Sequence, residues 1–245
     1  MMNPILESLY ARKSVRAYTD APISEELRSL LLDCAIQAPS AGCQMLYTIL
    51  DIRDQAVKDR MAELCDHQTF IARAPMVLVF CADCQRWPDM YAEAGCPSRK
   101  PAEGDLLLAE QDAIIAAQNL VVAAQAEGLG SCYIGDVLEN QEKMKELLHL
   151  PDYVIPACML VLGWPTQQQK DRPKPVRPER KYLVCTDRYT PLTREQLREM
   201  YRERAGAQGF DRWVTAFCKR KYDSQFSKEM SRSAHLWISP FKGKM

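Results

Sequence analysis

The longest apolar stretch of the chain, residues 106–127, restricts its fold more than any other feature. As a helix this stretch would be about 33 Å long. Charged residues inside it, such as Glu110 and Asp112, argue against a membrane span. Glutamines recur every seven residues from Gln111 to Gln125 and form one narrow polar stripe. Because a helix that is apolar on most sides must be covered on most sides, we expect a central helix that also packs on its copy in a second subunit.

The charge balance argues against a general electrostatic partner. The chain has 245 residues, of which 32 are basic and 32 are acidic, so we expect no binding to nucleic acid or to an anionic membrane surface. Its 47% apolar composition is enough for a sizeable core. The first seven residues lack the basic and apolar regions of a signal peptide. We therefore expect the ten cysteines to be reduced and the protein to be cytoplasmic.

Hydrophobic periodicity predicts helices and strands that alternate around the central helix. Prolines and charges make residues 164–191 an excursion rather than a regular element. The aromatic residues of the tail, 209–245, predict that it packs on the body or on a partner. We place one domain at 1–190 and a C-terminal helical extension at 191–245. The remaining predicted helices lie at 4–11, 25–38, 54–65, 140–148 and 193–207, and the predicted strands at 46–52, 76–81, 131–134 and 156–163.

Two clusters of cations predict a site for a phosphate monoester. The first, Arg-Lys-Ser-Val-Arg at 12–16, combines guanidinium forks, an ammonium group and a hydroxyl. The second, Arg-Pro-Lys-Pro-Val-Arg at 172–177, places further cations on a segment stiffened by proline. Taken alone, each cluster also fits a solvated basic loop.

Two turns of small residues could bring backbone amides close to a flat ring. They are Ala38–Gln44 and Gly130–Gly135, although each also fits a plain tight connection. Cys81 and Cys84 have the spacing of a redox pair, but they close a predicted buried strand, which favours two structural thiols. The three histidines show no ligand spacing, and we predict no metal site.

In this order the motifs resemble the FMN-dependent nitroreductase family, in particular its flavin-reductase-like and clostridial-type members. The resemblance extends from about Tyr10 to Tyr182. It implies an α+β fold, a nitroreductase-like sandwich with a central, mostly antiparallel sheet flanked by helices and the long central helix at a homodimer interface. The motifs that carry it are Arg-Lys-Ser-Val-Arg at 12–16, Ala-Pro-Ser-Ala-Gly at 38–42, Gly-Asp-Leu-Leu-Leu-Ala at 104–109, Gly-Ser-Cys-Tyr-Ile-Gly-Asp at 130–136 and Arg-Pro-Lys-Pro-Val-Arg at 172–177.

The resemblance also implies FMN sites between the subunits and a role for each motif. Arg172 is an alternative to Arg177 in the late basic loop. Cys43 departs from the family pattern, because related members commonly have Asn there. By position, the phosphate residues are Arg12, Lys13, Ser14, Arg16, Lys174 and Arg177. The residues lining the isoalloxazine are Ser40, Ala41, Gly42 and Cys43, with Tyr133, Ile134 and Gly135 near N5.

The activity implied is that of an NAD(P)H-dependent oxidoreductase that reduces nitroaromatics, quinones or flavins by ping-pong hydride transfer through flavin N5. No catalytic side chain is needed, because the flavin supplies the hydride chemistry. Two alternatives stay open: another flavin chemistry, such as reductive dehalogenation or flavin fragmentation, and a flavin-binding redox sensor that uses Cys43 with Cys81 and Cys84. The acceptor and the choice between NADH and NADPH are also open. Arg99 and Lys100 fit either a contact to a 2′-phosphate or a solvated loop.

Overall fold

The computed structural model describes residues 3–242, and the chain forms two compact units. Unit 1 consists of Met1–Arg172 together with Glu229–Met245, and unit 2 of Pro173–Lys228. The domain boundary predicted after residue 190 lies later in the chain than this division and stays a prediction.

A four-stranded antiparallel sheet forms the centre of unit 1. Its order is β1 (Tyr47–Ile52), β2 (Met76–Asp83), β4 (Val154–Gly163) and β3 (Gly130–Ile134). The two central strands, β2 and β4, are buried along almost their whole length, as expected for strands that are covered on both faces. The four predicted strands and the predicted antiparallel, α+β architecture are confirmed.

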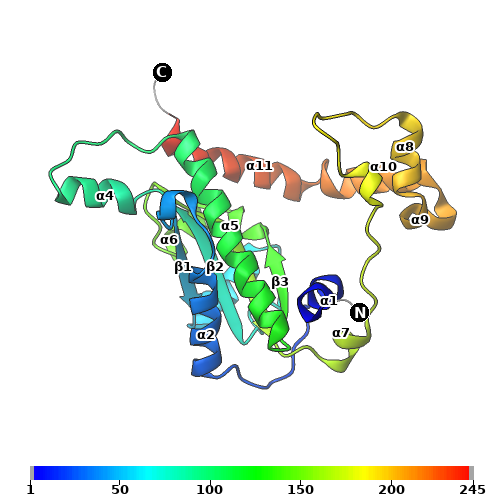
Figure 1. Cartoon of the computed structure of the whole chain (residues 1–245), viewed down its shortest axis with the longest axis horizontal. Helices are drawn as coiled ribbons and strands as arrows, with labels where there is room; N and C mark the ends of the chain where they lie inside the picture. The colour runs from blue at the N-terminus through cyan, green and yellow to red at the C-terminus, as the bar shows by residue number, and fades with distance from the viewer. Residues whose placement is uncertain (1–2, 243–245) are drawn as a thin grey trace. The chain divides into compact units, whose positions relative to one another are not determined.

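Helices cover both faces of this sheet. Figure 1 shows α2 (Glu25–Ile36) and α5 (Glu103–Ala126) side by side across one face, where they bury Met76, Leu78 and Phe80 of β2. The opposite face, which carries Val77 and Val79, packs against α3 (Gln55–Leu64) and α6 (Gln141–Leu147). Since β-strand side chains alternate between faces, one apolar strand supplies both cores. The predicted central helix is confirmed as α5.

Two short helices of unit 1 were not predicted: α4 (Arg86–Glu93) and α7 (Gln167–Asp171). The sequence of α4 contains Pro88, which a helix tolerates only in its first turn. Asp83 stabilises that turn, because its carboxylate accepts hydrogen bonds from the backbone N–H groups of Gln85 and Arg86. Helix α1 (Pro4–Ala11) spans the residues predicted for it. The side chain of Asn3 caps its N-terminus by accepting a hydrogen bond from the Leu6 N–H.

Unit 2 contains a helix break that the sequence did not predict. The helix expected at 193–207 is interrupted at Tyr201, whose φ of −118° is not helical. Trp213 packs against Tyr201 and Phe217, with ring centroids 5.3 and 5.4 Å apart. The helices of this region are α8 (Arg194–Met200), α9 (Arg202–Ala205), α10 (Phe210–Lys221) and the start of α11 (Gln225–Ile238).

The last described helical residues contribute to the core of unit 1. Trp237 and Phe241 are buried in the cluster on the α3 face of the sheet, and Trp237 Nε1 donates to the Leu138 carbonyl at 2.9 Å. The described part of the tail after residue 228 therefore packs on the body, one of the two arrangements predicted for residues 209–245, whereas residues 209–228 belong to unit 2. Residues 243–245 of that prediction lie outside the described residues.

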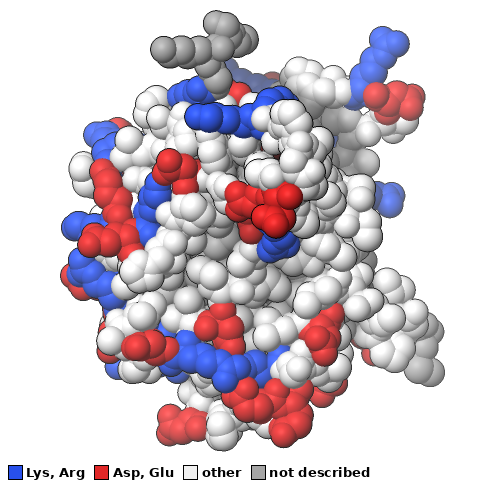
Figure 2. Space-filling model, turned by 90° about the vertical axis from the view of Figure 1, so that its left-hand side faces the viewer, with Lys and Arg blue, Asp and Glu red and all other residues white. Residues whose placement is uncertain are grey.

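Acidic and basic side chains are interspersed on the face shown in Figure 2, in keeping with the balanced composition. Among residues 3–242, α5 is the one helix that length and composition would allow to cross a membrane. Core helices of globular proteins meet the same criteria, and α5 buries Ala113, Ala117 and Leu120 against the sheet.

Candidate functional site

The basic N-terminal segment lies along the edge strand β3. Ser14 and Ser131 form a parallel bridge, and the Val15 N–H donates to the Ser131 carbonyl at 2.9 Å. This close approach requires Gly130, because a Cβ there would lie 2.6 Å from Val15 Cβ. The segment 12–16 is thus fixed against β3 by backbone pairing and by the absence of a side chain at one position.

Four cations gather around this segment within unit 1. The Arg12 guanidinium lies 5.7 Å from the centroid of the Tyr133 ring, and that of Arg16 lies 5.8 Å from the centroid of Phe70. Arg172 donates from Nη2 to the Ser14 carbonyl. Lys13 Nζ donates to the carbonyls of Lys170 and Arg172. Lys13 therefore ties the end of α7 to the N-terminal segment and keeps Arg172 beside Ser14.

Arg12 provides the clearest sign of a missing anionic partner. Its Nε and Nη2 atoms are buried, yet within the described residues they form no hydrogen bond. Buried polar atoms are nearly always paired, and a guanidinium pairs best with a carboxylate or a phosphate. A phosphate monoester would satisfy both nitrogen atoms, so the residues present fit the group that the motif predicted.

The thiol of Cys132 lies next to the same cations. Burial raises the pKa of Cys132, and the neighbouring Arg16, Ser14 and Arg12 oppose that rise.

The turn Ser40–Cys43 is held in an unusual backbone conformation. Gly42, Cys43 and Met45 all have positive φ, at 57°, 56° and 51°. This left-handed region is costly for residues with a side chain and persists only where other contacts impose it. Ser40 Oγ accepts from the Met45 N–H at 3.1 Å and supplies one such contact.

Asp112 of α5 supplies two more contacts to this turn. Its carboxylate is 3% exposed and accepts from the N–H groups of Ala41 at 2.9 Å and Leu46 at 3.2 Å. The side chains of α4 hold the following residues: Trp87 Nε1 donates to the Gln44 carbonyl at 2.9 Å, and Arg86 donates to the carbonyls of Met45 and Tyr47. The turn is thus fixed from α5 on one side and from α4 on the other.

The third motif, Tyr133–Gly135, is also anchored on α5. Tyr133 Oη donates to Gln118 Oε1 at 3.2 Å, and Ile134 is buried. Gly135 is exposed, and no atom lies within 4 Å of where its Cβ would stand, so its backbone is open to a ligand. Asp112 and Gln118 are six residues apart, about 9 Å along the helix. One helix therefore positions both the small-residue turn and the end of β3.

Residues 9–164 match the family model described as Nitroreductase family. The chain belongs to the nitroreductase family. It is 32% identical over 220 residues to the "Oxygen-insensitive NADPH nitroreductase" of Salmonella typhimurium, covering 86% of this chain and 88% of that protein. It is 30% identical over 243 residues to "FMN reductase (NADPH)" of Bacillus subtilis, covering 93% and 98%.

A solved structure also matches this nitroreductase along almost its whole length. NfrA1 of B. megaterium superposes with a TM-score of 0.81 at 26% identity, covering 96% of this chain and 98% of that one. The family and the nitroreductase-like fold expected from the motifs are therefore confirmed.

The predicted contacts of four further basic residues have different outcomes. Arg172, the alternative ligand, lies beside Ser14. Lys174 and Arg177 belong to unit 2, and their contact with the phosphate stays a prediction. Arg99 donates from both Nη atoms to Asp105, so its charge is already neutralised, which favours the solvated loop over a contact to a 2′-phosphate.

Sequence reasoning missed three residues that shape the site. Asp112 had a signal, since it is one of few acidic residues in the apolar helix, but that signal was interpreted only as evidence against a membrane span. Arg86 and Trp87 carried no signal, because α4 was not predicted. All three act on the turn backbone over 39–71 residues of sequence.

Proposed function

We propose that this nitroreductase is an FMN-dependent NAD(P)H oxidoreductase that reduces a small-molecule acceptor such as a nitroaromatic, a quinone or a flavin. The observation that carries the proposal is the buried guanidinium edge of Arg12 near Tyr133, which forms no hydrogen bond within residues 3–242. The printed names of the two relatives, an NADPH nitroreductase and an NADPH-linked FMN reductase, support the same cofactor and electron donor.

Arg12, Ser14 and Arg16 would hold the FMN phosphate, together with Arg172. Lys13, Lys174 and Arg177 stay in the proposal as further cations. Small residues at 40–43 would line the isoalloxazine, and the exposed backbone at Gly135 would face its other edge. When bound, FMN supplies the hydride transfer between NAD(P)H and the acceptor.

The chain's own contribution is position and rigidity. Asp112 and Trp87 keep the backbone of residues 41–46 in one conformation, so the shape of the turn is fixed before a ligand arrives, which lowers the entropic cost of binding. The cations of segment 12–16 are held by pairing with β3 and need little rearrangement.

A homodimer in the cytoplasm is part of the proposal. Apolar side chains stand exposed on α1 and on the first half of α5, and a second copy of the chain would cover them. Because both elements border the proposed site, a second copy packed there would complete it. The residues are Ile5, Leu6, Leu9, Tyr10, Leu107, Leu108, Ile114 and Ile115.

Cys81 and Cys84 are poor candidates for the thiol pair of a redox sensor. Cys81 and Cys84 are buried, and burial raises the pKa of both, that of Cys84 to about 12. The reactive form of cysteine is the thiolate, so neither side chain is a good sensor. Cys43 is exposed, but the turn at residues 38–44 contains no second cysteine with which it could form a disulfide. Dehalogenation and flavin fragmentation use the same cofactor and are distinguished by their products.

The test is FMN occupancy in the purified protein. Arg12→Ala removes a charged hydrogen-bond donor. We therefore expect this variant to bind FMN about 10- to 100-fold more weakly and to lose the flavin absorbance after dialysis. Arg60→Ala, which removes an exposed arginine paired with Glu63, is the control. Anaerobic titration with NADH and NADPH then measures reduction. Full flavin content in Arg12→Ala, or no flavin in the wild type, would contradict the assignment.

A further inference from the structure

The C-terminal helix α11 meets the body of unit 1 at the segment that follows Gly135. From Glu229 onwards its residues belong to unit 1. The segment consists of the short 3₁₀ helix η2 (Asp136–Leu138), Glu139 and the N-terminus of α6. Gly135 is the N-cap of η2, and its carbonyl accepts from the Leu138 N–H at 3.0 Å. Contacts that fix η2 and the start of α6 therefore also orient the backbone at Gly135.

Helix α6 begins without a cap from its own side chains. The first N–H groups of a helix have no acceptor within the helix. Asn140, at the N-cap position, makes no capping hydrogen bond, and its Nδ2 donates instead to the Leu64 carbonyl at 2.8 Å. The acceptors come from α11. Ser233 Oγ accepts from the Gln141 N–H at 3.1 Å. Glu229 Oε1 accepts from the Asn140 N–H at 3.2 Å. The start of α6 is thus capped by side chains that lie 92 and 89 residues away in the sequence.

Water cannot take over these caps. Ser233 is fully buried, so the loss of its hydroxyl would leave a buried N–H without an acceptor. Hydrogen bonds from Arg232, and then from Ser233, lower the pKa of Glu229 to about 2, so this acceptor stays ionised at neutral pH. Arg232 also donates from both Nη atoms to the carboxylate of Glu142, in the first turn of α6, at 2.8 and 2.9 Å. Three consecutive turns of contact therefore join α11 to the start of α6.

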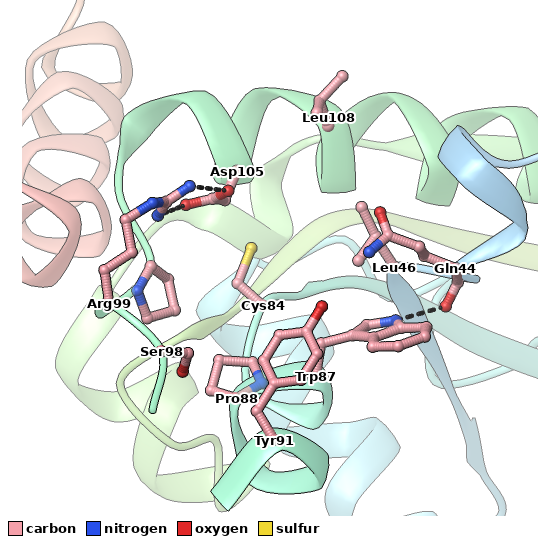
Figure 3. Close-up of a pocket in the computed structure, with 11 residues that line it drawn as sticks. Gln44, Leu46, Cys84, Trp87, Pro88, Tyr91, Ser98, Arg99, Asp105 and Leu108 are labelled. Carbon is pink, nitrogen blue, oxygen red and sulfur yellow. Dashed lines mark hydrogen bonds and ion pairs between the residues drawn. The ribbon is translucent and has the colours of Figure 1, made fainter. Parts of the chain in front are cut away.

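A tryptophan of α11 holds η2 in the same way as Trp87 holds the small-residue turn. Figure 3 shows the indole of Trp87 donating to the Gln44 carbonyl. In α11, Trp237 Nε1 donates to the Leu138 carbonyl at 2.9 Å. Trp237 is 3% exposed and belongs to the core, so its indole cannot shift without opening the packing around it. Both segments assigned to the isoalloxazine are thus followed by a carbonyl that an indole N–H fixes.

We propose that α11 positions the backbone that faces the flavin ring, with Ser233 and Trp237 orienting Gly135 through α6 and η2. This inference rests on the proposed function, which assigns Gly135 to the isoalloxazine. Hydrogen bonds and partial charges at the edge of a flavin tune its electron affinity, because they stabilise or oppose the charge that it gains on reduction. Ser233 and Trp237 are therefore positioning residues, and their loss changes the reduction potential of bound FMN as well as stability.

Hydrogen exchange of the purified protein, without added ligand, tests the contact itself. Ser233→Ala removes the acceptor of the Gln141 N–H. Trp237→Phe removes the donor to the Leu138 carbonyl and keeps an aromatic ring in the core. The loss of one hydrogen bond should make the amides of residues 138–142 exchange about 5- to 10-fold faster in each variant, as mass spectrometry of peptides can show.

Trp164→Phe is the matched control. Trp164 Nε1 donates to the Pro22 carbonyl at 3.0 Å, so this variant loses an equivalent indole hydrogen bond elsewhere in unit 1. It should leave exchange at residues 138–142 unchanged. Wild-type exchange in Ser233→Ala and Trp237→Phe, or an equal increase in Trp164→Phe, would overturn the proposal.

The reduction potential of bound FMN separates positioning from stability. Ser233→Ala and Trp237→Phe, loaded with FMN and reduced anaerobically beside a reference dye, should have a more negative potential than the wild type, because the reduced flavin loses stabilisation at its edge. Trp164→Phe should keep the wild-type potential. An unchanged potential in both α11 variants would overturn this inference alone. A wild type that binds no FMN would overturn the proposed function and this inference with it.

Discussion

Asp112 is a buried carboxylate that acts on a backbone rather than on a substrate. It satisfies the N–H groups of Ala41 and Leu46, which would otherwise be buried without an acceptor. Its two hydrogen bonds lie on either side of Gly42 and Cys43, which have positive φ, and together with the Ser40 contact to Met45 they hold this conformation. The acidic residue Asp112, although it lies in an apolar helix, therefore stabilises the turn by two hydrogen bonds.

We predict that Asp112→Ala lowers the free energy of unfolding by about 2–4 kcal/mol, because two donors lose their acceptor. The measurement is urea denaturation, with FMN content recorded on the same samples. Asp112→Asn keeps one acceptor oxygen and should lose less. If Ala and Asn variants unfold at the wild-type urea concentration, the anchoring role is wrong.

Glu139 predicts a pH dependence of stability. It is 5% exposed, and one of its oxygen atoms has no hydrogen-bond partner among the described residues. Burial, with Asp136, Asp66 and Glu229 nearby, raises its pKa from 4.5 to about 7. The folded state thus holds this proton more tightly than the unfolded state does.

The free energy of unfolding should therefore fall as the pH rises from about 4.5 to about 7, where the unfolded carboxyl is ionised and the folded one is not. Glu139→Gln should remove this part of the dependence. The measurement is Tm for both proteins across that range. Parallel Tm curves for the wild type and Glu139→Gln would show that Glu139 does not titrate in this way.

At the scale of elements, the contact between segment 12–16 and β3 depends on one missing side chain. Gly130→Ala would place a Cβ 2.6 Å from Val15 Cβ. We expect this overpacking to cost about 1–3 kcal/mol of stability and to weaken FMN binding, since the cations would move away from the strand.

Two further variants make that prediction specific. Gly135→Ala should be close to neutral for stability, because no atom lies within 4 Å of its Cβ position and its φ of −83° suits alanine. Val15→Gly combined with Gly130→Ala removes the Val15 Cβ from the clash and should recover part of the loss, as thermal and urea unfolding can show. Additive effects of the two substitutions would place the strain elsewhere.

At the scale of the whole molecule, the exposed apolar residues of α1 and α5 predict self-association. We expect the wild type to sediment as a dimer and Leu107→Glu with Ile114→Glu to sediment as a monomer, because a buried carboxylate in an apolar interface is costly. Leu107 and Ile114 are 63% and 40% exposed. Leu197→Glu, at an apolar position of α8 with 46% exposure, is the control. A monomeric wild type would contradict the proposed interface.

The sequence by itself determined the family, the four strands and the central helix. Apolar runs such as 76–81 predict buried strands wherever they occur, and the length and composition of 106–127 require a covered helix, because these signals depend only on neighbouring residues. The ordered motifs then predicted the fold. Local patterns could not reveal α4, since Pro88 obscures a helix that Asp83 stabilises through its side chain.

Only the tertiary structure decided how the site is held. Three contacts join residues that are far apart in the chain. They are the bridge between Ser14 and Ser131, the hydrogen bond from the Ala41 N–H to Asp112 and the hydrogen bond from Arg172 to the Ser14 carbonyl. Such contacts are selected by packing and by the need to satisfy buried polar groups, and neither is encoded in a local pattern. The chemistry of each side chain was readable from its identity, but its partner was determined by the folded chain.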